Sequence, residues 1–105
     1  MGVVKEPRRF SVCQLQSDND HQRLALVISP DEMNRHLATL LISPLTKHQR
    51  GWPTRVPVHF AGKDGEIALE WIHTIARDDI AKVVGQVPAQ TARQVAQILV
   101  EMFTY

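Results

Sequence analysis

Two residues, Arg23 and Thr46, are suited to bind a phosphate if the fold brings them together. Arg23 precedes the apolar run Leu24–Ile28, and Thr46 follows the apolar run Leu37–Ser43. If these runs pair as antiparallel strands, the start of the first and the end of the second lie at the same edge of the sheet. An arginine fork and a threonine hydroxyl can both donate hydrogen bonds to phosphate oxygens. The pair therefore suggests phosphoryl recognition, although a surface salt bridge and a turn cap are the more frequent uses of such residues.

Cations and one large aromatic residue follow directly after Thr46. They are Lys47, His48, Arg50, Trp52 and Arg55. This mixture can hold single-stranded nucleic acid through phosphate neutralisation and base stacking. The alternative is a solvated loop with Trp52 packed inward.

The charge of the chain is unevenly distributed. The segment Asn34–Lys63 contains five Lys or Arg and no Asp or Glu, so it carries +5, and because the whole chain is +1 the remainder carries −4. A basic central surface beside an acidic remainder suits a polyanion and also a cationic partner.

Glu70 and His73 form a second candidate pair, since a carboxylate and an imidazole can act as general base or acid. Glu70 lies in an apolar run, so we expect it to have a polar partner. A structural ion pair or hydrogen bond is the more common role for two such residues.

Other kinds of chemistry are not indicated. The five histidines are scattered and there is one cysteine, so we predict no bound metal and no cofactor. No glycine-rich phosphate loop is present, which argues against a nucleotide hydrolase. Cys13 lies in a strand-like run and is expected to serve packing alone.

The elements that must position these residues are short. With 105 residues we expect one domain, at residues 10–105 after a flexible tail at residues 1–9, and a possible dimer. The predicted strands are 10–15, 24–28, 37–43 and 56–60, the last at an edge or a bulge because Pro57 lacks an N–H, and then 66–72. Pro44 is expected to end the third strand, and Ala61–Gly65 to form a hairpin turn.

Helical and irregular segments complete the prediction. The polar link Pro30–His36 suits one helical turn, and residues 17–22 read as a loop. An amphipathic helix begins near Pro88, with apolar residues on one face at Ala92, Val95, Ala96, Leu99, Met102 and Phe103. The elements predict an α+β fold, a small, mostly antiparallel barrel-like sheet with a C-terminal helix covering an open side. No signal-like or membrane-spanning apolar run is seen, so a cytoplasmic location is expected.

Four runs of the sequence resemble the MazF/PemK toxins of type II toxin–antitoxin systems, in order and in spacing. They are Arg23-Leu-Ala-Leu-Val-Ile-Ser-Pro-Asp-Glu-Met-Asn34, Ile42-Ser-Pro-Leu-Thr46, Gly51-Trp-Pro-Thr-Arg-Val-Pro57 and Gly65-Glu-Ile-Ala-Leu-Glu-Trp-Ile-His-Thr74. The likeness covers roughly residues 23–103. It implies an SH3-like barrel of the CcdB/PemK type that forms a homodimer.

The resemblance also implies a function. It would be a metal-independent, sequence-specific endoribonuclease that cleaves single-stranded RNA, an mRNA interferase neutralised by a cognate antitoxin. Arg23 and Thr46 fall where the family has its catalytic arginine and threonine, with cleavage through a 2′,3′-cyclic phosphate. Glu70 and His73 align with a family acidic residue and a family arginine, and are candidates for catalytic support.

The chain departs from the family pattern in several places. The segment before Arg23 is shorter, and Asp18, Asp20 and His21 are candidates to replace the missing loop. Leu24 stands for the usual proline, Trp71 for glutamine and His73 for arginine. The compact start also resembles CcdB, a gyrase poison of the same fold, but Thr104-Tyr105 lacks the Trp-Gly-Ile ending of that protein. A degenerate module that binds RNA or antitoxin without cutting is the third alternative.

Overall fold

The computed structural model describes residues 6–16 and 23–104. In chain order the strands are β1 (Ser11–Leu15), β2 (Arg23–Val27), β3 (Thr39–Thr46), β4 (Arg55–Phe60), β5 (Lys63–Ala68), β6 (His73–Ala76) and β7 (Ile80–Gln86). The helices are α1 (Asp31–His36), α2 (Ala89–Phe103) and the single 3₁₀ turns η1 (Leu69–Trp71) and η2 (Arg77–Asp79). The strand order is β4-β5-β3-β2-β1-β7, and β6 pairs with β3. All of these pairings are antiparallel.

The first half of the chain forms the middle of the sheet. β1 and β2 lie within one residue of the predicted strands, and β2 pairs with both β1 and β3. Ala25, Leu26 and Val27 are all fully buried, as expected for a strand covered on both faces. The predicted loop 17–22 lies outside the described residues. Of the expected tail, Pro7 is buried, and the Arg9 N–H donates to Asp31 Oδ1 at 2.7 Å.

Pro44 does not end the third strand, so that prediction was wrong. β3 runs on to Thr46, and Pro44 stands opposite Ala25 of β2. On the edge of β3 that does not face β2, the pairing with β6 ends at Ile42 and the pairing with β5 starts at Leu45. A proline is tolerated here because it stands in the gap between these two neighbours, where no strand requires its missing N–H.

The hairpin between β4 and β5 is tighter than predicted. Its turn is Ala61–Gly62 alone, with φ of 54° and 76°, and Phe60 pairs directly with Lys63. Two residues with positive φ make a type I′ connection, whose twist matches the flanking strands. The prediction of a turn over Ala61–Gly65 was therefore too long. β4 is an edge strand, as Pro57 predicted.

The predicted strand 66–72 is interrupted. β5 ends at Ala68, the turn η1 follows, and β6 begins at His73. Both strands pair with the same strand, β3, but between the pairs Leu45–Ile67 and Ile42–His73 their side of the ladder contains three more residues. An insertion of this kind acts as a bulge, because the extra residues have no partner in the ladder and extend out of the sheet. Glu70 and Trp71 lie in it.

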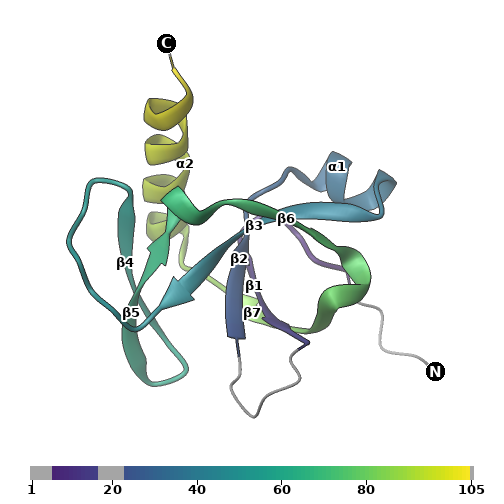
Figure 1. Cartoon of the computed structure of the whole chain (residues 1–105), viewed down its shortest axis with the longest axis horizontal. Coiled ribbons are helices and arrows are strands. Elements are labelled where there is room, and N and C mark those ends of the chain that lie inside the picture. The colour runs from purple at the N-terminus through teal and green to yellow at the C-terminus, as the bar shows by residue number, and fades with distance from the viewer. Residues whose placement is uncertain (1–5, 17–22, 105) are drawn as a thin grey trace.

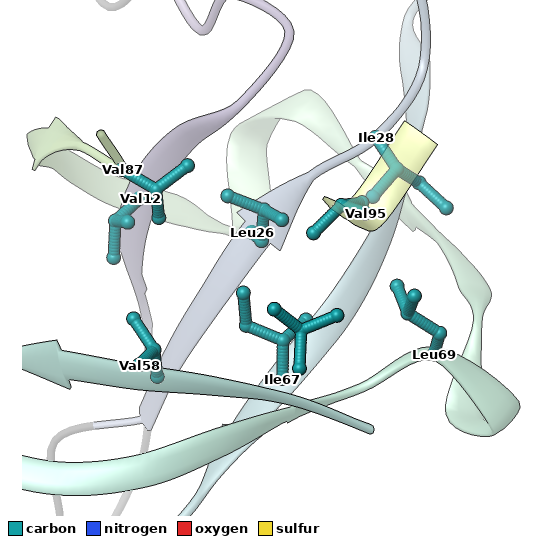
Figure 2. Packing of buried hydrophobic residues seen from close by; sticks show 9 residues of the cluster. Val12, Leu26, Ile28, Val58, Ile67, Leu69, Val87 and Val95 are labelled. Atoms are coloured by element: carbon teal, nitrogen blue, oxygen red, sulfur yellow. The ribbon is translucent and has the colours of Figure 1, made fainter. Parts of the chain in front are cut away.

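The core has two parts on the two sides of the curled sheet. The larger joins β1, β2, β4 and β5 to α2, and Figure 2 shows Val95 of the helix entering among its side chains. The smaller contains Cys13, Ala25, Val27 and Leu40, with Ile80 of β7. The sequence reasoning had not placed β7, whose residues are mostly half-buried or exposed and show no strict alternation.

The helices confirm the predicted pattern, except that Phe103 in the last turn of α2, expected on the apolar face, is 73% exposed. α1 follows Pro30 directly, and α2 follows Pro88. α2 stands beside the β4–β5 hairpin on one side of the molecule, and α1 lies on the other side (Figure 1). Ala92, Val95, Leu99 and Met102 pack on the core. The predicted α+β class, an antiparallel barrel-like sheet with a C-terminal helix, is confirmed.

Candidate functional site

The structure contains the antiparallel pairing that Arg23 and Thr46 require. Ala25 pairs with Pro44, and two residues further along the two strands stand Arg23 and Thr46. Arg23 starts β2 and Thr46 ends β3, so the two residues lie at the same end of the strand pair. The Arg23 side chain is exposed, and Thr46 is half-buried with its Oγ1 accepting the His48 N–H at 3.1 Å.

A cavity of about 640 Å³ opens beside Thr46. Leu24, Leu45, Val58 and Phe60 supply apolar lining, and Thr46, Lys47, Lys63 and Asp64 supply polar and charged groups. Two ammonium groups against one carboxylate leave the lining with a net positive charge. The cavity can therefore receive a ligand that combines an apolar ring with an anionic group.

Gly65 lets β5 approach the end of β3. A Cβ atom at this position would stand 2.5 Å from the Thr46 carbonyl oxygen, which is backbone and cannot swing aside. Only a residue without a side chain fits here, so Gly65 fixes the position of Thr46 relative to the cavity.

Arg55 is the centre of a buried ionic network. Its side chain is only 2% exposed. Its Nε and Nη2 each lie 2.7 Å from Glu70 Oε2, and its Nη1 lies 3.2 Å from both Glu66 Oε1 and the His48 carbonyl oxygen. Hydrogen bonding to Glu70 raises the pKa of the Arg55 guanidinium. Two carboxylates therefore compensate this one cation.

The same network anchors the basic loop that follows Thr46. Glu66 Oε1 accepts the Arg50 N–H at 2.8 Å, and Glu66 Oε2 accepts the Gly51 N–H at 3.0 Å. These backbone donors are the main cause of the lowered pKa of Glu66, with Arg55 adding to the effect. Glu66 itself stands opposite Thr46 in the β3–β5 ladder, so one side chain ties the loop to the end of β3.

Glu70 and His73 are not joined to each other by a hydrogen bond or an ion pair among the described residues. The expectation that Glu70 has a polar partner is confirmed, since it binds Arg55 and accepts the Thr54 hydroxyl at 2.7 Å. Its pKa is lowered, chiefly by the hydrogen bond from Arg55. His73 is exposed, with its Nδ1 3.0 Å from the Trp71 carbonyl oxygen.

The five predicted nucleic-acid contacts fall into two classes. Lys47, His48, Arg50 and Trp52 are exposed, so Trp52 is not packed inward. Arg55 is buried and paired, and offers no free donor face to a phosphate. Sequence reasoning missed Glu66 and Lys63. The signal for Glu66 was a carboxylate diagonal to Arg55 across the β4–β5 pair, two residues from Ala68, which stands opposite Arg55. No sequence pattern reveals this without the register.

No group of three or more His, Cys, Asp or Glu that could hold a metal ion occurs within residues 6–16 and 23–104. Cys13 is fully buried in β1, and burial raises the pKa of its thiol to about 11. A thiol in this setting is protonated at neutral pH and serves packing.

Comparison with known proteins identifies the family. The model of the PemK-like, MazF-like toxins of type II toxin–antitoxin systems matches residues 9–103. The chain belongs to this toxin family. The match spans nearly the whole sequence, including both Arg23 and Thr46. No curated protein matches the toxin sequence.

Solved structures support the toxin fold. MazE–MazF (Form-II) from Deinococcus radiodurans is similar with a TM-score of 0.81 at 19% identity, covering 96% of this chain and 98% of that chain. The toxin MazF-mt6 from Mycobacterium tuberculosis gives a TM-score of 0.77 at 22% identity, with coverage of 89% and 95%. An endoribonuclease in complex with its cognate antitoxin from a mycobacterial species gives 0.76 at 22%, with 93% of each chain covered. At these identities the likeness concerns the fold.

No helix in the described part of the toxin is long and apolar enough to cross a membrane.

Proposed function

We propose that this toxin is a metal-independent, sequence-specific endoribonuclease that cleaves single-stranded RNA, including mRNA. The observation that carries the proposal is the shared end of β2 and β3, where Arg23 and Thr46 lie and where Thr46, Lys47 and Lys63 line a cavity. Family membership supports it, and one solved structure of the same fold is an endoribonuclease.

The proposed reaction is an attack of the RNA 2′-oxygen on the adjacent phosphorus. A bond from O2′ to phosphorus forms, the bond from phosphorus to O5′ breaks, and the products are a 2′,3′-cyclic phosphate and a free 5′-hydroxyl. Arg23 stabilises the charge that develops on the phosphorane and gives a proton to the leaving oxygen. Thr46 orients the phosphate so that the attacking oxygen lies in line.

The 2′-hydroxyl proton passes to a base, and the two candidates for catalytic support differ in their suitability. Both carboxylate oxygens of Glu70 accept hydrogen bonds, and its lowered pKa makes it a weak proton acceptor. In His73 the Nδ1 must carry the proton that binds the Trp71 carbonyl oxygen, because a carbonyl only accepts. In the neutral imidazole the Nε2 then keeps a lone pair, so we assign the base to His73 rather than Glu70.

The RNA would run over the exposed residues that follow Thr46. Lys47, His48 and Arg50 neutralise phosphates, and Trp52 offers a ring for stacking. Arg55 acts from beneath by holding this surface in shape and does not touch the RNA. This revises the role predicted for Arg55 from the sequence and keeps the roles of the other four.

The same proposal includes partners. Solved relatives include MazE–MazF and an endoribonuclease with its cognate antitoxin, and we infer that this toxin is likewise bound by a cognate antitoxin, in the cytoplasm. It also forms a homodimer burying about 800 Å² or more per subunit. Light scattering at micromolar concentration tests this, and a monomer would contradict it.

The decisive experiment incubates the purified toxin with a long mixed-sequence RNA in EDTA, beside an Arg23→Ala control, and maps the fragment ends. We expect discrete cuts that bear cyclic phosphate and are absent from the control. Intact RNA with the folded wild-type toxin would overturn the proposal and turn attention to gyrase, the target of CcdB. Equal cleavage by Arg23→Ala would overturn the role of Arg23.

A further inference from the structure

Both tryptophans of the toxin lie on its surface. Trp52 is 48% exposed and Trp71 is 53% exposed, and they are the two Trp residues of the sequence. A single exposed apolar residue is ordinary. Two of the largest aromatic side chains exposed beside one another are not, and such rings mark binding sites more often than chance.

One buried cation holds the two rings. The Arg55 guanidinium carbon lies 4.8 Å from the centre of the Trp52 ring and 5.2 Å from that of Trp71. Arg55 is itself fixed by Glu66 and Glu70, so its position does not depend on any ligand. The rings are therefore positioned in advance of binding, which reduces the entropy lost when a ligand stacks on them.

The pair is close in the fold to the proposed reaction site. Trp52 belongs to the loop that leaves Thr46, and Glu66, which binds Arg55, stands opposite Thr46 in the ladder. Trp71 reaches this place because the three-residue insertion after β5 takes it out of the sheet. The neighbouring free charge is positive: Arg50 is exposed and lies 5.6 Å from the Trp52 ring centre. Aromatic faces beside exposed cations complement a strand of bases and phosphates better than they complement an apolar partner.

We propose that Trp52 and Trp71 form a stacking site for nucleobases flanking the cleaved phosphate, with Arg50 on the adjoining phosphate. This inference rests on the proposed ribonuclease function and adds residues that determine its specificity. Bases that stack strongly are preferred at this site. Trp71 contributes to binding by stacking through its ring, whereas a smaller polar side chain at the same position would contribute hydrogen bonds.

The two tryptophans make the test direct, because they are the only source of tryptophan fluorescence. The probes are 2′-O-methyl oligonucleotides of A, C or U, which cannot be cleaved since the attacking hydroxyl is blocked. We expect quenching on binding, with A stronger than U. Inorganic polyphosphate, which has charge and no bases, should bind with little quenching. The variants Trp52→Phe and Trp71→Phe show which ring responds.

Alanine variants then measure the contribution of each ring. Trp52→Ala and Trp71→Ala should each weaken oligonucleotide binding about 10-fold or more, the range reported for loss of one base–aromatic stack. The matched control is Leu37→Ala, which removes a side chain of equal exposure, 48%, in the link between α1 and β3 and should leave binding unchanged. Urea unfolding of each variant separates lost binding from lost folding.

The outcomes distinguish this inference from the proposed function. Quenching by oligonucleotides without any cleavage of ordinary RNA keeps the stacking site and removes the ribonuclease. Cleavage without quenching, or folded alanine variants with unchanged affinity, overturns the stacking site alone. Dissociation of a dimer by Trp71→Ala in light scattering would assign the rings to contact between copies, and would also overturn it.

Discussion

Arg23 and Arg55 are arginines at the first positions of two strands, and the fold uses them in opposite ways. Arg23 starts β2 with an exposed side chain that has no hydrogen bond or ion pair to any other described residue. Arg55 starts β4 and is buried between two carboxylates and two indole rings. The sequence marks both as cations available to a polyanion. The comparison shows that the availability of a charge depends on which carboxylates the sheet register and the insertion at η1 bring close to it.

The largest expected effects come from substituting each arginine in turn. Arg23→Ala should lower RNA cleavage on the order of 100-fold or more, as for the loss of one donor to a developing oxyanion. Its free energy of unfolding should stay within about 0.5 kcal/mol of the wild type, because the residue is exposed. Arg55→Met should instead destabilise the toxin by about 2 kcal/mol or more, since Glu66 and Glu70 lose their buried partner. Urea unfolding and cleavage rates measured on both variants check this, and equal destabilisation by the two would remove the distinction.

A second prediction concerns how Thr46 is held. Gly65→Ala should cost about 1–3 kcal/mol of stability, because the new Cβ would meet the Thr46 carbonyl oxygen at 2.5 Å. Cleavage should fall as Thr46 is displaced. Gly85→Ala is the control, since its Cβ would meet the Phe60 ring at 3.0 Å and a side chain can yield. Thermal unfolding decides, and a smaller loss for Gly65→Ala than for Gly85→Ala would contradict the account.

Acid should weaken the buried ionic network of Arg55, Glu66 and Glu70. Glu66 and Glu70 have pKa values lowered from the usual 4.5, so folding favours their ionised forms. The stability that they contribute is complete above about pH 4.5 and is lost as the pH falls through their lower folded pKa values. The free energy of unfolding should therefore decline below that pH, and Glu66→Gln should make the decline shallower. Glu32→Gln, in an exposed pair with Arg35, is the control that should keep the wild-type slope.

The smallest expected effect tests which cations meet phosphate. If Arg23, Lys47, Arg50 and Lys63 each neutralise one phosphate, the log–log slope of RNA affinity against salt is about −3. Arg50→Met should make the slope shallower by about 0.7, and Arg55→Met should leave it unchanged in the folded protein. Fluorescence anisotropy with a labelled 2′-O-methyl RNA between about 50 and 200 mM salt measures it. A slope that changes with Arg55 and not with Arg50 would reverse the roles.

Much of the fold could be predicted from local patterns. The apolar runs at β1 and β2, the proline-started helices α1 and α2 and the edge position of Pro57 all rest on short-range rules, and the structure confirms them. The failures have a common cause. Pro44 inside β3 and the break after Ala68 depend on how β5 and β6 share one edge of β3, which is a property of the assembled sheet.

The candidate site divides in the same way. The common end for Arg23 and Thr46 followed from one antiparallel pairing, which needed only two adjacent strands. The network of Arg55, Glu66 and Glu70 needed the β4–β5 register and the insertion at η1, and neither can be read from residue types. Trp71 was noted as a departure from the family pattern, but its place beside Trp52 became visible only through the arginine between them.

The single cysteine has a kinetic consequence. Cys13 lies in β1 between β2 and β7, fully buried and with its thiol protonated at neutral pH. A thiol reagent can reach it only while β1 is separated from a neighbouring strand, so the rate of alkylation reports how often the centre of the sheet opens. The fluorescence of the two tryptophans instead reports on ligand binding at the surface. The same molecule therefore carries one signal for opening of its core and a separate one for binding at its surface.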